Sequence, residues 1–178
     1  MPHEPKRKQR PPLDAEALER LALFYAGRYA TTKARLRSYL SRKLRERGWA
    51  GEREPGIEAL VERLAGLGYV DDRAFAAGRA ASLTRRGYGE RRVRDSLQAA
   101  GIAAEDAAPA REQAESEAWS AALRFAERRR IGPFAEAEAD RAGREKAIGA
   151  MLRAGHPPAI VRLLVNARPG GIPDSDGF

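Results

Sequence analysis

The sequence predicts an all-α protein built as a tandem repeat of three three-helix modules. Apolar residues recur at intervals of three and four positions along most of the chain, as on one face of a helix, and the strict alternation of a β-strand is nearly absent. Gly48, Gly101 and Gly155 each follow a helical stripe at a spacing of about 50 residues, which is typical of helical repeat arrays. Units this small must share core with their neighbours. The alternative is three unrelated helical hairpins that look alike because Leu, Ala and Arg are common.

The first module is expected at residues 14–68. Three apolar stripes predict its helices, and they consist of Leu18, Leu21, Ala22, Tyr25 and Tyr29, then Leu36, Tyr39, Leu40 and Leu44, then Ile57, Leu60, Val61 and Leu64. Thr31 or Thr32 can cap the second helix, and Gly48 can end it. Pro55 is expected in the first turn of the third helix.

The second module is expected at residues 69–112. Asp71 or Asp72 can cap its first helix, which carries the apolar residues Phe75, Ala76, Ala80 and Leu83. Val93 and Leu97 mark a central helix that ends at Gly101. The segment after Ile102 has the weakest helical pattern, because it is rich in alanine, contains Pro109 and has few large apolar residues.

The third module is expected at residues 113–168. Its three stripes consist of Ala114, Ala118, Ala121, Ala122 and Phe125, then Ala147, Ile148, Met151 and Leu152, then Ile160, Val161, Leu164 and Val165. The flanking segments, residues 1–13 and 169–178, are rich in proline, glycine and charge. We expect both to be disordered tails.

Composition excludes several kinds of site. The chain has no cysteine and two histidines, so disulfides, cysteine-based zinc sites and histidine-rich metal clusters are excluded. A Ser-His-Asp arrangement would have to use His156, which we interpret as a helix-end residue. Apolar runs are far shorter than a membrane span, and the N-terminus lacks the apolar core of a signal peptide. We therefore expect a soluble protein without a cofactor.

Positive charge clusters on the central helices of the first two modules. The net charge is +8, with nine positive residues between positions 28 and 53 and six between positions 79 and 94. Such clusters favour binding to a polyanion, although most charged runs are simply solvated surfaces. The candidate binding residues are Arg35, Arg37, Arg42, Lys43, Arg85, Arg86, Arg91, Arg92 and Arg94. The run 128–130 either closes a helix with favourable charge or extends this basic surface.

Adjacent carboxylates at Asp71 and Asp72 could serve as an acid–base pair or bind a metal. They follow Gly68 and precede a helix, however, where an aspartate accepts hydrogen bonds from free backbone N–H groups. We therefore interpret this segment as a structural junction between the first two modules. Its residues are Gly68, Tyr69, Asp71, Asp72 and Phe75. An enzyme that uses the two aspartates is the less favoured alternative.

The segment Gly68-Tyr69-Val70-Asp71-Asp72-Arg73-x-Phe75-Ala76 resembles the RecX family of bacterial recombination regulators. In that family a similar run is followed by Arg/Lys-Gly and then by an arginine-rich helix ending in Lys-Gly-Ile. This chain has Arg86-Gly87, an arginine-rich segment and Ala100-Gly101-Ile102, so the similar block covers residues 66–102. Ala100 replaces the family's lysine. Looser matches at residues 35–43 and 151–155 extend the resemblance over most of residues 14–168.

The resemblance implies an elongated, curved, right-handed-type array of modules that binds the RecA recombinase on single-stranded DNA. Such proteins inhibit strand exchange, ATP hydrolysis and the coprotease role of the filament in the SOS response, and they are not enzymes. The expected partners are therefore the RecA filament and single-stranded DNA, with duplex DNA as a further candidate, for a monomeric cytoplasmic protein that does not bind membranes. The alternative is a helix-turn-helix regulator that reads duplex DNA, usually as a symmetric dimer.

Overall fold

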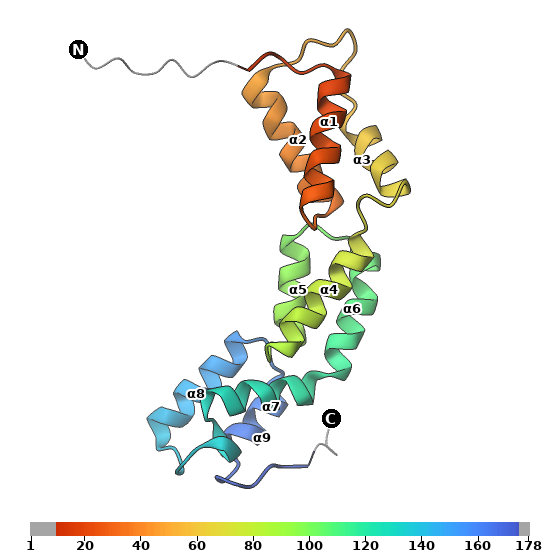
Figure 1. Ribbon diagram of the computed structural model, residues 1–178. Helices are drawn as coiled ribbons and strands as arrows, with labels where there is room; N and C mark the ends of the chain where they lie inside the picture. Colours follow the sequence, from red (N-terminus) through yellow and green to blue (C-terminus); the bar gives the residue numbers. More distant parts are fainter. Residues whose placement is uncertain (1–9, 175–178) are drawn as a thin grey trace, which may run out of the picture. The chain divides into compact units, whose positions relative to one another are not determined.

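A computed structural model describes residues 10–174, and they form an all-helical chain (Figure 1). The helices are α1 (Ala15–Arg28), α2 (Lys33–Arg47), α3 (Ile57–Gly66), α4 (Asp72–Arg85), α5 (Glu90–Ala99), α6 (Ala104–Ser116), α7 (Ala118–Arg129), α8 (Arg141–Arg153) and α9 (Pro158–Asn166), with a short 3₁₀ turn at Gly132–Phe134. The predicted all-α, three-module class is confirmed. The chain divides into two compact units, Met1–Asp72 and Arg73–Phe178. No helix within residues 10–174 has the length and apolar character to span a bilayer.

Helices α1, α2 and α3 surround the core of the first unit. Leu18, Leu36, Leu40 and Leu64 from these helices are almost fully buried, as the apolar stripes predict. Leu13 is also fully buried, although we expected it in a disordered tail. Its backbone is hydrogen-bonded on both sides, with N–H donation to the Gly48 carbonyl at 2.9 Å and acceptance from Ala50 N–H at 2.8 Å. The prediction for residue 13 was therefore wrong, and residues 1–9 of that tail lie outside the described part.

Capping residues set most helix starts in the first unit. Thr32, of the two predicted threonines, caps α2 by accepting from Arg35 N–H at 3.2 Å. Gly48 ends α2, as predicted, with a φ of 81°. Pro55 does not lie in the first turn of α3, because the chain becomes helical only at Ile57.

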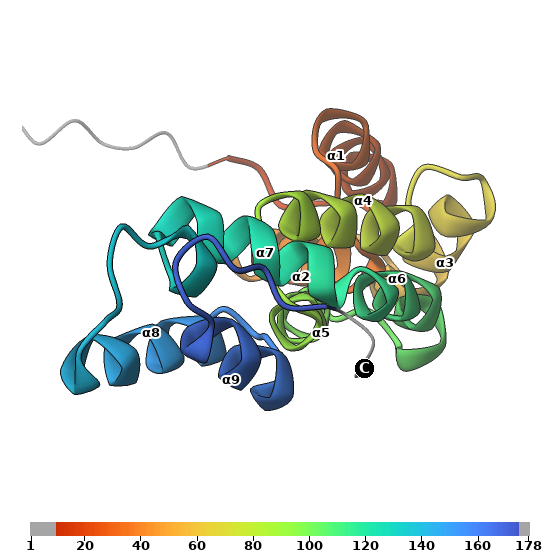
Figure 2. The same cartoon turned by 90° about the horizontal axis from the view of Figure 1, so that it is seen from below.

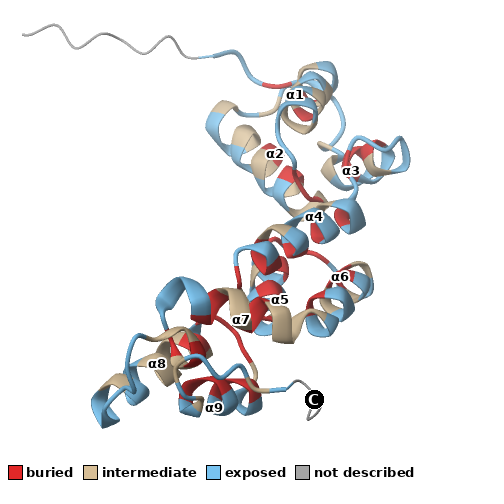
Figure 3. Ribbon diagram, turned by 60° about the horizontal axis from the view of Figure 1, so that its bottom comes forward, coloured by how far each residue is buried: buried red, intermediate tan, exposed pale blue. Residues whose placement is uncertain are grey.

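The second unit contains two helix triplets, each with its own core. Helices α4, α5 and α6 bury their inward faces against one another (Figure 3), and α9 packs on both α8 and α7 (Figure 2). The predicted module boundary at 112/113 lies inside α6, which runs without a break to Ser116. Ala114, which we assigned to the third module, is 2% exposed and belongs to the core of α4, α5 and α6. The boundary therefore moves to residue 117, between α6 and α7.

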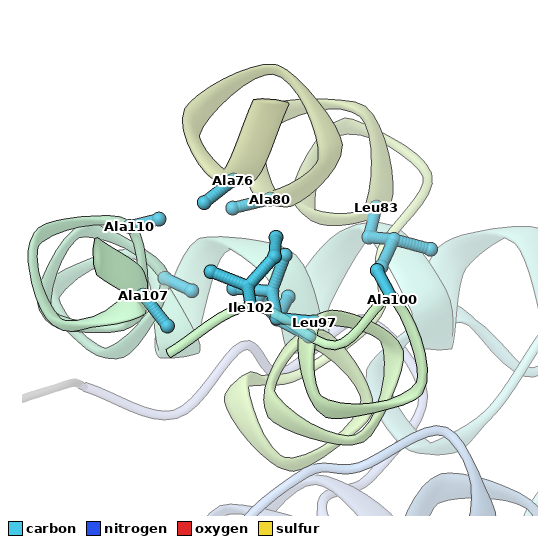
Figure 4. Packing of buried hydrophobic residues seen from close by; sticks show 10 residues of the cluster. Ala76, Ala80, Leu83, Leu97, Ala100, Ile102, Ala107 and Ala110 are labelled. Carbon is cyan, nitrogen blue, oxygen red and sulfur yellow. The ribbon is translucent and has the colours of Figure 1, made fainter. Parts of the chain in front are cut away.

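Alanine dominates the core between α4 and α6. Ala76 and Ala80 of α4 lie close to Ala107 and Ala110 of α6 (Figure 4). Alanine has the highest helix propensity of the common residues, and Leu97 and Ile102 supply the larger apolar side chains of the same core. These features explain why α6 forms without large apolar residues and with Pro109 in its interior.

The predicted C-terminal tail begins with an ordered turn. Gly170 N–H donates to the Pro133 carbonyl at 2.8 Å, and Gly171 N–H donates to the Arg168 carbonyl at 3.0 Å. The prediction of a disordered segment from residue 169 onward was therefore wrong at its start. Residues 175–178 lie outside the described part.

Asp72 caps a helix, but not the one expected from its position in the sequence. It is the first residue of α4, yet its Oδ1 accepts a hydrogen bond from Lys33 N–H, in the first turn of α2, at 2.9 Å. The side chain is buried, with 6% exposure. A carboxylate at this position satisfies a free N–H and interacts favourably with the α2 dipole. Asp71, by contrast, is exposed.

We expect Asp72→Ala to lower the free energy of unfolding by about 0.5–2 kcal/mol, because Lys33 N–H then loses its buried acceptor. Asp72→Asn keeps an acceptor oxygen and should retain most of the stability. Urea unfolding followed by circular dichroism compares the three proteins. Equal stability of the wild type and the Ala variant would contradict this role for Asp72.

A candidate polyanion-binding site

The nine candidate basic residues lie in two different units. Arg35, Arg37, Arg42 and Lys43 belong to α2, whereas the other five lie at the end of α4 and along α5, and they are Arg85, Arg86, Arg91, Arg92 and Arg94. Seven of the nine are exposed, and Arg37 and Lys43 are half-buried. The two groups differ in how their charges are compensated.

Carboxylates compensate much of the positive charge on α2. Arg37 Nε donates to Glu58 Oε1 at 2.5 Å, and this hydrogen bond raises the pKa of Arg37 and lowers that of Glu58. Lys43 Nζ donates to Glu46 Oε2 at 2.6 Å, which lowers the pKa of Glu46, and Arg42 approaches the same carboxylate at 3.7 Å. The first basic cluster therefore carries less net charge than a count of its arginines suggests.

Carboxylates compensate less of the positive charge of the candidate arginines in the second unit. Within residues 10–174, Arg85, Arg86, Arg91 and Arg92 form no ion pair with a carboxylate, and Arg94 approaches only its neighbour Asp95, at 3.6 Å. Arg86 and Arg92 instead lie near the Tyr88 ring, with their guanidinium carbons 5.4 and 6.0 Å from its centroid. A guanidinium over an aromatic ring keeps its donors available for an anion.

Helix α7 adds two arginines to this group. Arg128 Nη1 donates to the Arg86 carbonyl at 2.5 Å, which places Arg128 beside the end of α4. Arg128 and Arg129 lie 5.5 and 5.7 Å from the centroid of the Phe125 ring. We call Arg86, Arg92, Arg128 and Arg129 the junction arginines.

Sequence analysis left two roles open for the run 128–130, which were to close a helix with favourable charge or to extend the basic surface. Each role applies to part of the run. Arg128 and Arg129 lie with the basic residues of the second module, whereas Arg130 pairs with Glu136 at 2.8 Å. Arg130 has a left-handed backbone, with a φ of 53°, and it caps the C-terminus of α7.

Close backbone contact holds the second and third modules together at this point. Gly89 N–H donates to the Ala154 carbonyl at 3.0 Å, and a Cβ on Gly89 would overlap the Gly155 carbonyl oxygen. Gly155 has a φ of 91°, and a Cβ there would overlap the backbone N of Arg92. Only glycine allows the backbone to approach so closely and to adopt this conformation without strain. The start of α5, which carries Arg92, is thereby fixed against the end of α8.

His156 lies buried in the same contact. Its side chain is 3% exposed, its Nε2 donates to the Gly87 carbonyl at 3.1 Å, and its ring meets Phe125 edge-on at 5.4 Å. Its Nδ1 is buried without a hydrogen-bond partner among the described residues. Burial lowers the pKa of His156 to about 4, partly opposed by the hydrogen bond to Gly87, so the ring is neutral near pH 7. His156 does follow a helix end, as expected, but it also forms part of the contact between two modules.

Sequence analysis missed this contact because Gly155 was interpreted only as a helix end, Gly87 only as a helix end within a family motif, and Gly89 was given no role. The sequence did contain one signal for this contact. His156 lies between Gly155 and Pro157, two small residues that leave room for another helix end to cover the histidine ring.

The segment around Asp71 and Asp72, predicted to join the first two modules, contains both buried and exposed side chains. Asp72 is buried and caps α2, and Phe75 is half-buried against the core of the second module. Gly68 ends the turn after α3 with a φ of 79°. Tyr69 is 53% exposed and so does not share the burial of its neighbour Val70. Within residues 10–174, no group of three or more Asp, Glu or His side chains is placed to hold a metal ion.

The sequence is similar to a known three-helix domain and to two named regulatory proteins. Residues 71–110, which span α4, α5 and most of α6, match the family model of the RecX second three-helix domain. The regulatory protein RecX of Myxococcus xanthus is 32% identical over 177 residues, covering 92% of this chain and 95% of that protein. RecX of Mycobacteroides abscessus is 34% identical over 115 residues, covering 64% of this chain and 54% of that protein.

Two solved structures share the fold. The crystal structure of RecX from Lactobacillus salivarius aligns with a TM-score of 0.63 at 17% identity, over 85% of this chain and 94% of that one. A second crystal structure of a regulatory protein RecX aligns with a TM-score of 0.59 at 20% identity, over 84% of this chain and 72% of that one.

Acid should destabilise the contact around His156. The unfolded chain binds a proton on this residue near pH 6.5, whereas the folded chain resists protonation until about pH 4. The stabilising effect of the neutral ring is therefore complete above pH 6.5 and is lost as the pH falls toward 4, by at most about 3 kcal/mol. His156→Gln, which can still donate to Gly87, should lack this component.

Urea unfolding of the wild type and the Gln variant over this pH range measures the effect. Carboxylates titrate in both proteins, so the difference between the two free energies of unfolding isolates the histidine. A difference that does not change with pH would contradict the buried neutral state of His156.

Proposed function

Since the chain belongs to the RecX family of regulatory proteins, we propose that it binds RecA filaments on single-stranded DNA and inhibits their recombinase, ATPase and coprotease activities. In the cell this inhibition modulates DNA repair and the SOS response. The protein acts by binding, in the cytoplasm, without a cofactor and without catalysis.

The junction arginines are the observation that carries this proposal. Arg86, Arg92, Arg128 and Arg129 are exposed and form no ion pair with a carboxylate within the described residues. The backbone beside Arg86 and Arg92 is held by the close contacts of Gly87, Gly89 and Gly155, so little backbone ordering is needed there on binding. A filament of RecA on DNA offers both phosphates and carboxylates, and the planar guanidinium fork matches either group.

Other basic residues have graded roles in this proposal. Arg85, Arg91 and Arg94 extend the junction arginines along α4 and α5. The α2 residues contribute less, because Arg37 and Lys43 would first have to leave Glu58 and Glu46. An exposed ion pair of this kind is worth about 0–1 kcal/mol, so exchanging it for a filament phosphate gives little net affinity.

The aspartate pair does not take part in chemistry in this proposal. Asp72 accepts the hydrogen bond from Lys33 N–H, and its side chain is buried. A residue used in this way is poorly placed to exchange protons with a substrate.

RecA ATP hydrolysis on single-stranded DNA, with this protein added below stoichiometry, tests the proposal. The wild type should inhibit. The triple variant Arg86→Ala, Arg92→Ala, Arg129→Ala should need about tenfold or more protein for the same inhibition, since hydrogen bonds to charged groups contribute about 1.5–3 kcal/mol each. Arg128 is retained because its side chain also donates to the Arg86 carbonyl.

The matched control replaces Arg20, Arg141 and Arg144 by alanine, which removes the same charge from exposed helical positions outside the basic clusters. It should inhibit like the wild type. Absence of inhibition by the wild-type protein at any ratio would overturn the proposed function. Equal loss in the two triple variants would show that net charge, not the junction arginines, is responsible.

A further inference from the structure

A continuous surface of aromatic and cationic side chains covers the end of α1 and the middle of α2, away from the junction arginines in the sequence. We call it the aromatic–cationic surface, and it consists of Phe24, Tyr25, Arg28, Tyr29, Tyr39, Arg42 and Lys43. Sequence analysis assigned Tyr25, Tyr29 and Tyr39 to the apolar stripes of two helices and gave them no role in binding.

Each member of this surface contacts the next. The Tyr25 ring stacks on Tyr39 with centroids 4.2 Å apart and planes 14° apart, and it meets Tyr29 at 5.3 Å. The Arg28 guanidinium carbon lies 5.9 Å from the Phe24 centroid and 6.0 Å from that of Tyr29.

At the other end of the surface, two cations flank the Tyr39 ring. The guanidinium carbon of Arg42 lies 5.7 Å from the ring centroid, and Lys43 Nζ lies 5.8 Å from it. Three tyrosine rings in contact therefore have cations at both ends of the row, across two helices.

Packing explains only part of this arrangement. Tyr25 and Tyr39 are half-buried and fasten α1 to α2 by their stacking. Phe24 is 60% exposed and Tyr29 is 51% exposed, so these two rings contribute little to the core. Single exposed aromatics are common, but adjoining ones that share a cation characterise a surface for binding.

The charge of the surface limits the kind of partner. Its three cations face one carboxylate, that of Glu46, which Arg42 and Lys43 share at 3.7 and 2.6 Å. Arg28 forms no ion pair within the described residues. The surface is therefore positive, and a partner must combine negative charge with flat apolar faces.

We propose that the aromatic–cationic surface binds single-stranded nucleic acid, with bases stacked on Tyr29 and Phe24 and phosphates near Arg28. Arg42 and Lys43, which share Glu46, add a weaker attraction for the backbone. Every base has a flat face that can stack on an aromatic ring, and arginine and lysine follow the backbone. A duplex keeps those faces inside its own stack, so it could use only the cations. This binding requires no filament, and its test is separate from that of the proposed function.

Fluorescence anisotropy with two labelled oligonucleotides of equal length tests the inference, one of thymidines and one fully abasic. The two strands carry the same phosphates, so a difference in affinity reports the bases. The full-length wild type should bind the thymidine strand at least about fivefold more tightly, since stacking on one ring gives that much or more.

The double variant Phe24→Ala, Tyr29→Ala should lose this preference while it binds the abasic strand as before. Tyr69→Ala is the matched control, because Tyr69 is 53% exposed in the same unit but outside the surface, and it should behave like the wild type. Circular dichroism should show that all variants are folded.

Equal binding of the two strands by the wild type, or no binding to either, would overturn the inference. It would also be overturned if the double variant lost RecA inhibition without any change in its preference for bases, because the surface would then contact protein. RecA inhibition by the wild type, measured in parallel, reports on the proposed function independently of either result.

Discussion

The approach of two backbones at Gly89 and Gly155 is the constraint on which the second unit depends. No Cβ fits at either position, and the resulting contact encloses His156 against Gly87 and Phe125. The same contact fixes the start of α5 against the end of α8. At Gly87, where a Cβ would meet the backbone of Phe125, α7 comes close enough for Arg128 to reach the Arg86 carbonyl. Four arginines, from the turn after α4 and from α5 and α7, are thereby assembled on a rigid support, which lowers the cost of ordering them on a partner.

The two basic clusters differ in how many of their cations pair with carboxylates, more than in how many arginines they contain. The α2 cluster is richer in positive residues, yet Glu46 and Glu58 hold three of its four candidate binding residues. The junction arginines lie over aromatic rings, which leave their hydrogen-bond donors available except for the one that Arg128 donates to the Arg86 carbonyl. In the first unit, aromatic rings appear again beside cations. There Tyr25 and Tyr39 stack on each other and are half-buried, whereas Phe24 and Tyr29 are exposed. The two units therefore present different groups at their surfaces, unpaired guanidinium groups in the described part of the second unit and exposed aromatic rings beside cations in the first.

Large apolar residues made most of the fold predictable from the sequence. Stripes of leucine and isoleucine located the helices of the first and third modules, because burial of such side chains at helical spacing dominates local structure. Helix α6 was the weakest prediction, because the side chains that it buries are alanines. It also ends at Ser116, beyond the predicted module boundary at 112/113. Leu13 and Asp72 form their hydrogen bonds with Gly48 and Lys33, which are 35 and 39 positions distant. Contacts between residues so far apart in the sequence produce no pattern of apolar spacing. The same holds for the contact between Gly89 and Gly155.

Amide hydrogen exchange of the wild-type protein, free and bound to RecA filaments on single-stranded DNA, tests the central claim most directly. The claim is that the junction arginines meet the filament. Exchange should slow on binding in two segments that are distant in sequence, residues 84–94 and 124–130. Unchanged exchange in both segments, with protection confined to other helices, would contradict it.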